Sequence, residues 1–351
     1  MNKKRLVLID FQNFLFRCLK TNYQAFGINK ENVNVIYGFL KNMYDLMLIM
    51  ESGGFNCDYI CCNDSGYDAR YKLSEEAVFK GIIAKTYKED RRYISACASD
   101  EEKAEKEENK RQALIVKELL NCTKIKQAYL EGEEADDVCG SLANKNYDKY
   151  DSIILVTSDQ DYYQLLNDKV SIYNSIKKEW FGINEFKEKF ELNDSSQWID
   201  RGALLGDKGD TILGLSGCGE VKSLKFIKQF GTLKDFILNA EKETKELTDK
   251  YNNDINALCD AVYSKQEKTK IEKLYFKLIS EKEKVLLAYD LKKIRTRLDV
   301  KLFGGFSDEK TLRMKLDDLG ISLRESYFDK FIESKNMSRI INDLNKRRNL
   351  F

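Results

Sequence analysis

Aspartates mark the ends of three apolar runs in this sequence. Asp10 follows the run 5–9, Asp64 follows the run 58–62, and Asp159 and Asp161 follow the run 152–156. Short apolar runs separated by longer amphipathic stretches are typical of buried parallel strands. Ligands of an open parallel sheet bind beyond the carboxyl ends of its strands, so we expect these acids to converge on one pocket.

More carboxylates flank the third run. They are Glu133, Glu134, Asp136 and Asp137 before it, and Asp207 and Asp210 after it. Acids in a first helical turn can simply complement the helix dipole, but four in five residues exceed what capping needs. Glu134 and Asp137 are three residues apart and therefore share a helix face. A pocket this rich in carboxylates would hold protons unless divalent cations neutralise it, which predicts metal-ion chemistry.

Composition excludes several other chemistries. The sequence contains no histidine, which rules out Ser-His-Asp hydrolysis, Cys-His proteases and His-ligated zinc. Nine cysteines are scattered without a disulfide framework, and no second cluster completes a zinc site around Cys57, Cys61 and Cys62. No apolar run approaches the roughly 18 residues that a membrane span needs. We therefore expect a cytoplasmic protein with no membrane association.

The order of the elements predicts an α/β fold with a mostly parallel central sheet flanked by helices. We expect helices over 35–50, 132–146 and 198–205, and a further strand over 170–173. The charged, helix-forming stretch 68–121 is too long for a plain crossover, so part of it should stand away from the sheet. The remainder, 240–351, reads as helical and charged, with no chemistry assigned.

A glycine-rich turn over 214–219 contains Gly217 and Gly219 and precedes a helix with Lys222, Lys225 and Lys228 on one face. Glycines let a backbone approach a phosphate, and a helix N-terminus offers free N–H donors. The plainer alternative is a tight turn between packed helices with a solvated face. The net charge of +1 is uninformative, but an acidic centre beside a basic rim suits a polyanion that is held at its ends and cut in the middle.

Taken in order, these motifs resemble the 5′ nucleases, a family that includes flap endonucleases, bacterial polymerase-associated 5′ nuclease domains and phage 5′–3′ exonucleases. The phage and bacterial branch is the most similar. The motifs are Asp10 with Asn13, Asp64, the E-A-D-D signature at 134–137, T-S-D-x-D at 157–161, G-D-x-x-D at 206–210, the helix–three-turn–helix glycines at 214–219, Y-K-x-x-R at 87–91, and an upstream arginine at Arg70. The resemblance covers roughly residues 5–235, with a longer spacing than usual between Arg70 and Tyr87.

The resemblance implies a PIN-like 5′-nuclease fold: a catalytic domain over 1–200 with a helical arch over about 68–121, a helix–three-turn–helix DNA-binding region over 201–290, and a C-terminal helical extension over 291–351. It implies metal ligation by Asp10, Asp64, Glu134, Asp136, Asp137, Asp159, Asp161, Asp207 and Asp210, with Glu134, Asp136, Asp159 and Asp161 innermost. It assigns charge stabilisation at the scissile phosphate to Lys88, Arg70 and Arg91, and DNA contacts to Tyr87, Gly217, Gly219, Lys222 and Lys225.

The implied activity is that of a structure-specific 5′ nuclease in DNA replication or repair, acting as a 5′–3′ exonuclease and a 5′-flap endonuclease. Two Mg²⁺ ions, replaceable by Mn²⁺, would serve the reaction, and K⁺ would bind at the helix–three-turn–helix turn. The expected partners are DNA with 5′ flaps, nicks or single-stranded 5′ ends, and RNA–DNA primers. We expect a monomer in a bacterial or phage-infected cell.

Two alternatives remain open. A catalytically inactive nuclease-like module could bind branched nucleic acid, although binding alone would not favour so many carboxylates near phosphates. An aspartate-dependent phosphatase could use Asp10 as its nucleophile. That fold usually has a second acid two residues later, where this sequence has Gln12.

Overall fold

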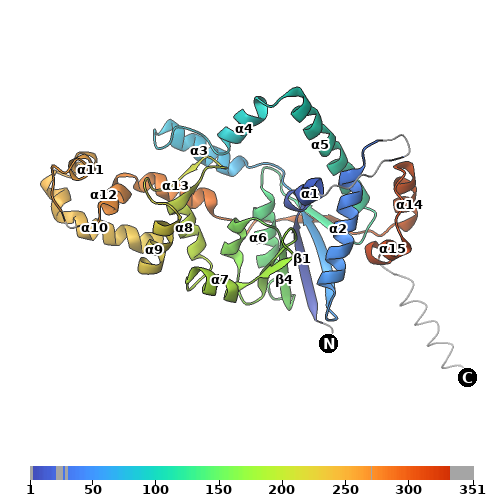
Figure 1. Cartoon of the computed structure of the whole chain (residues 1–351). Coiled ribbons are helices and arrows are strands. Elements are labelled where there is room, and N and C mark those ends of the chain that lie inside the picture. Colours follow the sequence, from blue (N-terminus) through green and yellow to red (C-terminus); the bar gives the residue numbers. More distant parts are fainter. Residues whose placement is uncertain (1–2, 21–26, 28–30, 270, 333–351) are drawn as a thin grey trace, which may run out of the picture.

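A seven-stranded sheet forms the centre of the computed structural model, which describes residues 3–20, 27, 31–269 and 271–332 (Figure 1). The strand order is β6-β5-β4-β1-β2-β3-β9, where β1 is Lys4–Asp10, β2 Asn56–Cys62, β3 Lys126–Tyr129, β4 Ser152–Val156, β5 Val170–Asn174, β6 Glu179–Phe181 and β9 Lys301–Gly304. The five inner strands are parallel, and β6 and β9 run antiparallel at the two edges. The expected mostly parallel sheet is confirmed.

Both faces of the sheet are covered, which explains why its central strands are continuously apolar. Within β1, Leu6 and Leu8 belong to one core, and Val7 and Ile9 belong to the other, as the two-residue period of a strand requires. The strands in register with β1 are β2 on one side and β4 on the other, so Asp10 lies beside the ends of both.

The chain forms these helices: α1 Phe11–Lys20, α2 Asn34–Met50, α3 Asp68–Phe79, α4 Glu89–Ala96, α5 Asp100–Leu120, α6 Ala135–Asn146, the 3₁₀ helix η1 Gln160–Leu165, α7 Ile183–Phe190, α8 Gln197–Leu205, α9 Glu220–Phe230, α10 Leu233–Lys250, α11 Ile255–Tyr263, α12 Lys273–Ser280, α13 Lys282–Lys292, α14 Glu309–Asp318 and α15 Glu325–Phe331. A two-stranded ribbon, β7 Gly206–Asp207 with β8 Ile212–Leu213, follows α8. None of the described helices is both long and apolar enough to span a membrane.

Helices α3, α4 and α5 extend above the sheet (Figure 1). Every residue of α4 is at least partly exposed, as is the first half of α5. A capping box at Ser99 and Glu102 starts α5. The second half of α5 packs on α2, where Gln112 Oε1 accepts the Val35 N–H at 3.0 Å. Part of the stretch 68–121 thus stands away from the sheet, as the sequence predicts.

Helices α8 to α13 form a helical lobe beside the sheet (Figure 1). Its core contains a stack of Phe226, Phe230 and Phe236, in which the ring of Phe236 lies 4.4 Å from that of Phe226. The expected turn over 214–219 connects the β-ribbon to α9 within this lobe.

The C-terminal part differs from the all-helical extension that the sequence suggests. Residues 301–304 form β9, which pairs antiparallel with β3, another strand that the sequence analysis missed. Helices α14 and α15 then pack near α2, where Tyr327 stacks on Tyr44 at 4.2 Å. Both strands have four residues, too few to show a clear two-residue alternation. In addition, β9 ends at Gly304, and both this residue and the following Gly305 have positive φ.

We predict that Gly214→Ala destabilises the protein and that Gly219→Ala does not. A Cβ at Gly214 would lie 2.5 Å from backbone atoms of Leu204, Leu205 and Gly206, whereas a Cβ at Gly219 meets no atom within 4 Å. We expect Gly214→Ala to lower the free energy of unfolding by about 3 kcal/mol and Gly219→Ala by less than about 1 kcal/mol. Urea denaturation of both variants measures this difference, and equal losses would contradict the packing described.

Candidate active site

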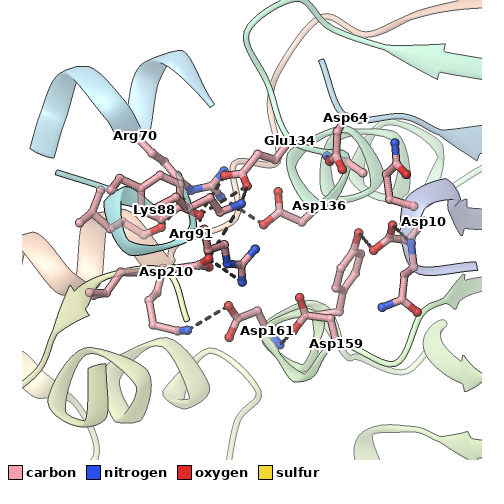
Figure 2. A pocket seen from close by; sticks show the side chains of 18 of the residues that line it. Asp10, Asp64, Arg70, Lys88, Arg91, Glu134, Asp136, Asp159, Asp161 and Asp210 are labelled. Atoms are coloured by element: carbon pink, nitrogen blue, oxygen red, sulfur yellow. Dashed lines mark hydrogen bonds and ion pairs between the residues drawn. The ribbon is translucent and has the colours of Figure 1, made fainter. Parts of the chain in front are cut away.

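A cavity of about 590 Å³ opens at the carboxyl ends of the parallel strands (Figure 2). Its lining carboxylates are Asp10, Asp64, Glu134, Asp136, Asp159, Asp161 and Asp210. Its lining cationic side chains are Arg70, Lys88, Arg91 and Lys292. Seven of the nine predicted acids therefore share one cavity, and Asp137 and Asp207 lie outside it.

Asp10 connects the first strand to the T-S-D-x-D segment. Its Oδ1 accepts the Asn13 N–H at 3.1 Å, and its Oδ2 accepts the hydroxyls of Tyr162 at 3.1 Å and Thr157 at 3.3 Å. The Asn13 side chain in turn accepts the Ser158 N–H at 2.9 Å. These bonds fix the two acidic motifs relative to each other before any ligand binds.

Asp64 connects the second strand to the E-A-D-D helix. Its Oδ1 accepts the N–H of Ala135, the first residue of α6, at 2.7 Å. A carboxylate at a helix N-terminus is stabilised by the unpaired N–H groups there. This bond therefore helps to place Glu134 and Asp136 in the lining of the same cavity.

Lys88 reaches into the cavity from the base of α4 (Figure 2). Its backbone is left-handed, with φ of 56°, and its N–H donates to the Asp210 carbonyl at 2.9 Å. The ammonium forms an ion pair with Glu134 and lies 4.0 Å from Asp210. The longer spacing after Arg70 has therefore not moved this lysine away from the acids.

Tyr87 directly precedes Lys88 in the sequence, and Arg91 follows it by three residues. The Arg91 guanidinium pairs with Asp210 at 2.8 Å and donates to the Gly209 carbonyl at 2.7 Å, while remaining exposed. The Tyr87 hydroxyl lies 3.1 Å from Glu134, and the residue is only 4% exposed. Tyr87 therefore holds an acid in this structure, whereas the sequence analysis expected it to contact DNA.

Arg70 is placed among the acids of the E-A-D-D motif. The resemblance implies that it stabilises the scissile phosphate, but all three guanidinium nitrogens are bonded within the protein. They pair with Glu134 at 2.6 Å, Asp137 at 2.7 Å and Asp136 at 3.3 Å, and the residue is 4% exposed. With its donors committed, Arg70 organises the acids of α6.

Asp137 lies outside the cavity, beside Arg70. It is fully buried, and its two oxygens accept bonds from Arg70 and from the guanidinium and backbone N–H of Arg295. Successive residues of a helix point about 100° apart, so Asp136 enters the cavity while Asp137 turns towards the segment after α13. Two arginines therefore hold both oxygens of Asp137, and the residue does not line the cavity.

Asp207 lies in a neighbouring cavity, which also contains Trp198 and Arg201. Its Oδ2 accepts the ammonium of Lys292 at 3.1 Å, and its Oδ1 accepts the Gly209 N–H at 2.8 Å. Burial alone would raise the pKa of Asp207, but the Lys292 ammonium and the N–H groups of Gly209 and Asp210 together lower it. Sequence reasoning missed Lys292, because a lysine at the end of an ordinary helix carries no local signal.

The predicted DNA-binding residues of the turn lie apart from the cavity. Gly217 has φ of 80°, a conformation that favours glycine, and Gly219 precedes the first turn of α9. Lys222 and Lys225 are exposed on α9, and Lys222 donates to the Gly217 carbonyl at 3.1 Å. The turn and the lysines therefore form one accessible surface next to the β-ribbon.

Several acids of the cavity have pKa values above the ordinary value of a carboxyl group. Burial, and then the neighbouring Asp64, raise the pKa of Asp10 to about 7. Burial, and then Asp161, raise the pKa of Asp159 to about 6. Burial also raises the pKa values of Asp64, Asp136 and Asp210, although Lys88 opposes the rise at Asp210 and Arg70 opposes it at Asp136. The cations present do not compensate the acids fully.

The donor set fits hard divalent cations. Among the residues that the structure describes, no three Cys, Asp or Glu side chains are already arranged to hold an ion. Mg²⁺ does not need such a cage, because it usually keeps several waters and takes one or two carboxylates together with phosphate oxygens. Suitable oxygens come from the seven acids that line the cavity, Asp10, Asp64, Glu134, Asp136, Asp159, Asp161 and Asp210.

The fold and the site define a nuclease-like α/β protein with acids at its strand ends and an overhanging helical segment. Residues 5–191 match the model of the 5′-3′ exonuclease N-terminal resolvase-like domain, and the chain belongs to that family.

Similar proteins agree with this assignment. The chain is 27% identical over 248 residues to the thermostable DNA polymerase I of Thermus thermophilus, an alignment that covers 70% of this chain and 26% of that protein. It is 29% identical over 247 residues to the 5′-3′ exonuclease of Buchnera aphidicola, covering 68% of this chain and 75% of that one. A structure of the bacteriophage T5 D15 flap endonuclease with DNA and metal ions has 19% identity, a TM-score of 0.60, and coverage of 93% and 97% of the two chains. This chain thus spans about a quarter of the polymerase relative and most of the exonuclease relative.

We predict that, in EDTA, the protein loses stability as the pH rises from 5 to 8. Asp10 and Asp159 have raised pKa values, so in this window the folded protein binds more protons than the unfolded chain, and stability must fall with pH. The sequence contains no histidine that would titrate in the same window. At about 1.4 kcal/mol per pKa unit, we expect a loss of roughly 3 kcal/mol or more.

Urea denaturation at pH 5 and pH 8 in EDTA measures this loss. Asp10→Asn removes one of the two carboxyl groups with a raised pKa, so the free energy of unfolding of this variant should depend less on pH. A stability that is constant or rises with pH would contradict the electrostatic description of the cavity.

Proposed function

We propose that this protein is a structure-specific 5′ nuclease that hydrolyses phosphodiester bonds of DNA with the help of two Mg²⁺ ions, replaceable by Mn²⁺. One observation carries the proposal: seven carboxylates line one cavity, and the Lys88 ammonium enters the same cavity from the base of an exposed helical segment. When bound, the metal ions would supply a water of lowered pKa and would neutralise charge on the leaving oxygen.

The residues of the chain would perform distinct tasks. Glu134, Asp136, Asp159 and Asp161 would hold the ions, and Asp10, Asp64 and Asp210 would act largely through bound waters. Lys88 would leave Glu134 for a phosphate oxygen, because a cation is most effective where negative charge builds in the transition state. Arg91, the exposed neighbour, would contact the same phosphate or the adjacent one.

The rest of the chain would position the nucleic acid. The turn with Gly217 and Gly219 would approach the backbone of a duplex, with a K⁺ ion at the turn, and Lys222 and Lys225 would contact phosphates. A single-stranded 5′ end would lie under α4 and α5. We propose DNA with 5′ flaps, nicks or single-stranded 5′ ends as substrates, RNA–DNA primers as further ones, and a monomer as the active form.

The geometry disfavours the two alternatives. Asp10 accepts three hydrogen bonds and has a pKa raised to about 7, which makes it a poor aspartyl nucleophile for a phosphatase. A module that only binds nucleic acid would not benefit from uncompensated acids beside the phosphates.

Cleavage of a labelled 5′-flap duplex tests the proposal. We expect cleavage with Mg²⁺ or Mn²⁺, none in excess EDTA, and binding without cleavage in Ca²⁺. Asp159→Asn with Asp161→Asn should abolish cleavage while preserving the fold, because removing like charges relieves repulsion. Undiminished cleavage in EDTA, or wild-type rates in the double variant, would refute the site. Retention of the flap without cleavage in Mg²⁺ would favour the inactive module.

Lys88→Ala should slow the chemical step about a hundredfold, roughly 2.7 kcal/mol, while weakening DNA binding far less. Single-turnover cleavage with enzyme in excess isolates the chemical step from binding and product release. Lys85→Ala is the matched control, because Lys85 lies three residues earlier, is exposed and pairs only with Asp90 among the described ion pairs. A normal single-turnover rate for Lys88→Ala would remove Lys88 from the mechanism.

Lys222→Ala and Lys225→Ala should weaken DNA binding and lower the slope of log affinity against log salt by about one unit per lost phosphate contact. Sequence preference should not change, because phosphate contacts position the duplex without reading it. Binding is measured in Ca²⁺ over a range of salt. Lys228→Ala serves as the control, since Lys228 already pairs with Glu191 at 2.8 Å. An unchanged slope would show that the two lysines form only a solvated helix face.

A further inference from the structure

The segment 291–295, at and just after the end of α13, touches every acidic motif after Asp64, although it lies outside the matched family region 5–191. The Arg70 Nε donates to the Leu291 carbonyl at 2.9 Å. The Gln164 side chain, next to the T-S-D-x-D motif, bonds the carbonyl of Lys292 at 3.0 Å and the N–H of Ile294 at 2.9 Å. Arg295 pairs with Glu133 and Asp137 of the E-A-D-D region. The segment is thus fixed on both sides of Lys292.

Lys292 projects from this segment between the two cavities and lines both of them. Its ammonium lies 2.9 Å from Asp161 Oδ2 and 3.1 Å from Asp207 Oδ2. Only 8% of the side chain is exposed. A Cβ at Gly202 of α8 would lie 3.1 Å from the lysine stem, so the glycine leaves room for it. The surrounding residues therefore hold the ammonium in one place, where it bridges Asp161 of the cavity and Asp207 outside it.

We propose that Lys292 is a positioning residue that acts as an internal counter-cation, competing with a divalent ion for Asp161 and so setting the metal concentration at which the site fills. The inference rests on the proposed metal-dependent function. A divalent ion on Asp161 would bring two positive charges close to the ammonium, and the repulsion between them is strong in a partly desolvated site. The ammonium must therefore withdraw towards Asp207 whenever the ion binds.

This role accounts for the position of Asp207. The acid lies outside the main cavity, where it can hold the displaced lysine instead of a metal ion. It differs from the role of Lys88, whose ammonium faces the open cavity beneath α4. Lys292 would act through Asp161 without touching the substrate.

Calorimetric titration of the full chain with Ca²⁺, without DNA, tests the proposal. Lys292→Met should bind Ca²⁺ about tenfold or more tightly than the wild type, because the competing charge is gone. Its melting temperature should fall without metal and rise more than that of the wild type on adding Ca²⁺. Lys292→Arg, which keeps the charge, should remain near the wild type. Lys293→Met, at the neighbouring exposed lysine, is the matched control and should change neither property.

Removing Lys292 leaves two acids without a cation, so a second comparison avoids dependence on the folding of that variant. Asp207→Asn and the double variant Asp207→Asn with Lys292→Met differ only in the lysine, and the double variant has one unpaired acid fewer than Lys292→Met. We expect the double variant to bind Ca²⁺ more tightly than Asp207→Asn alone.

Equal or weaker Ca²⁺ binding without Lys292, in both comparisons, would overturn the proposal and leave the nuclease assignment intact. If the wild type bound neither Ca²⁺ nor Mn²⁺, the proposed metal site itself would fail, and this inference would fail with it.

Discussion

The crowding of seven carboxylates into one cavity is the constraint on which the rest of this structure depends. Carboxylates that share one cavity either take up protons or require cations nearby. The protein supplies part of the compensation through four cationic side chains, Arg70, Lys88, Arg91 and Lys292. Burial, and then the neighbouring Asp64, still raise the pKa of Asp10 to about 7. The remaining negative charge is what gives the cavity its proposed affinity for divalent metal ions.

The four cations come from different parts of the chain, so charge compensation also holds the architecture together. Arg70 is on α3 and anchors the acids of α6 to the end of α13. Lys88 and Arg91 attach the base of α4 to Glu134 and to the loop after α8. Lys292 joins the helical lobe to the T-S-D-x-D motif. The pairs of Arg70 and Lys292 are well buried, and breaking such a pair is costly because it leaves an uncompensated charge. The overhanging helices, the lobe and the sheet are therefore coupled through the site that they enclose.

The sequence predicted the features that depend on backbone direction and missed those that depend on where side chains point. Asp10, Asp64, Asp159 and Asp161 were predictable because acids at the ends of parallel strands must meet at one edge of a sheet. The directions in which the Arg70 and Asp137 side chains point could not be predicted, because a one-residue change along a helix turns a side chain by about 100°. Lys292 and the strand β9 come from a charged C-terminal region with little local pattern. Only the tertiary fold brings them back to the site and to the sheet.

Anomalous diffraction from crystals of the protein soaked in Mn²⁺ tests the central claim most directly, because it locates metal ions independently of activity. The account predicts two anomalous peaks inside the cavity, within coordination distance of Glu134, Asp136, Asp159 and Asp161 and beneath the Lys88 side chain. Arg70 should still pair with Asp137, and no peak should lie on Asp137. Manganese bound only outside this cavity, or a cavity that stays without a peak at millimolar Mn²⁺, would contradict the account.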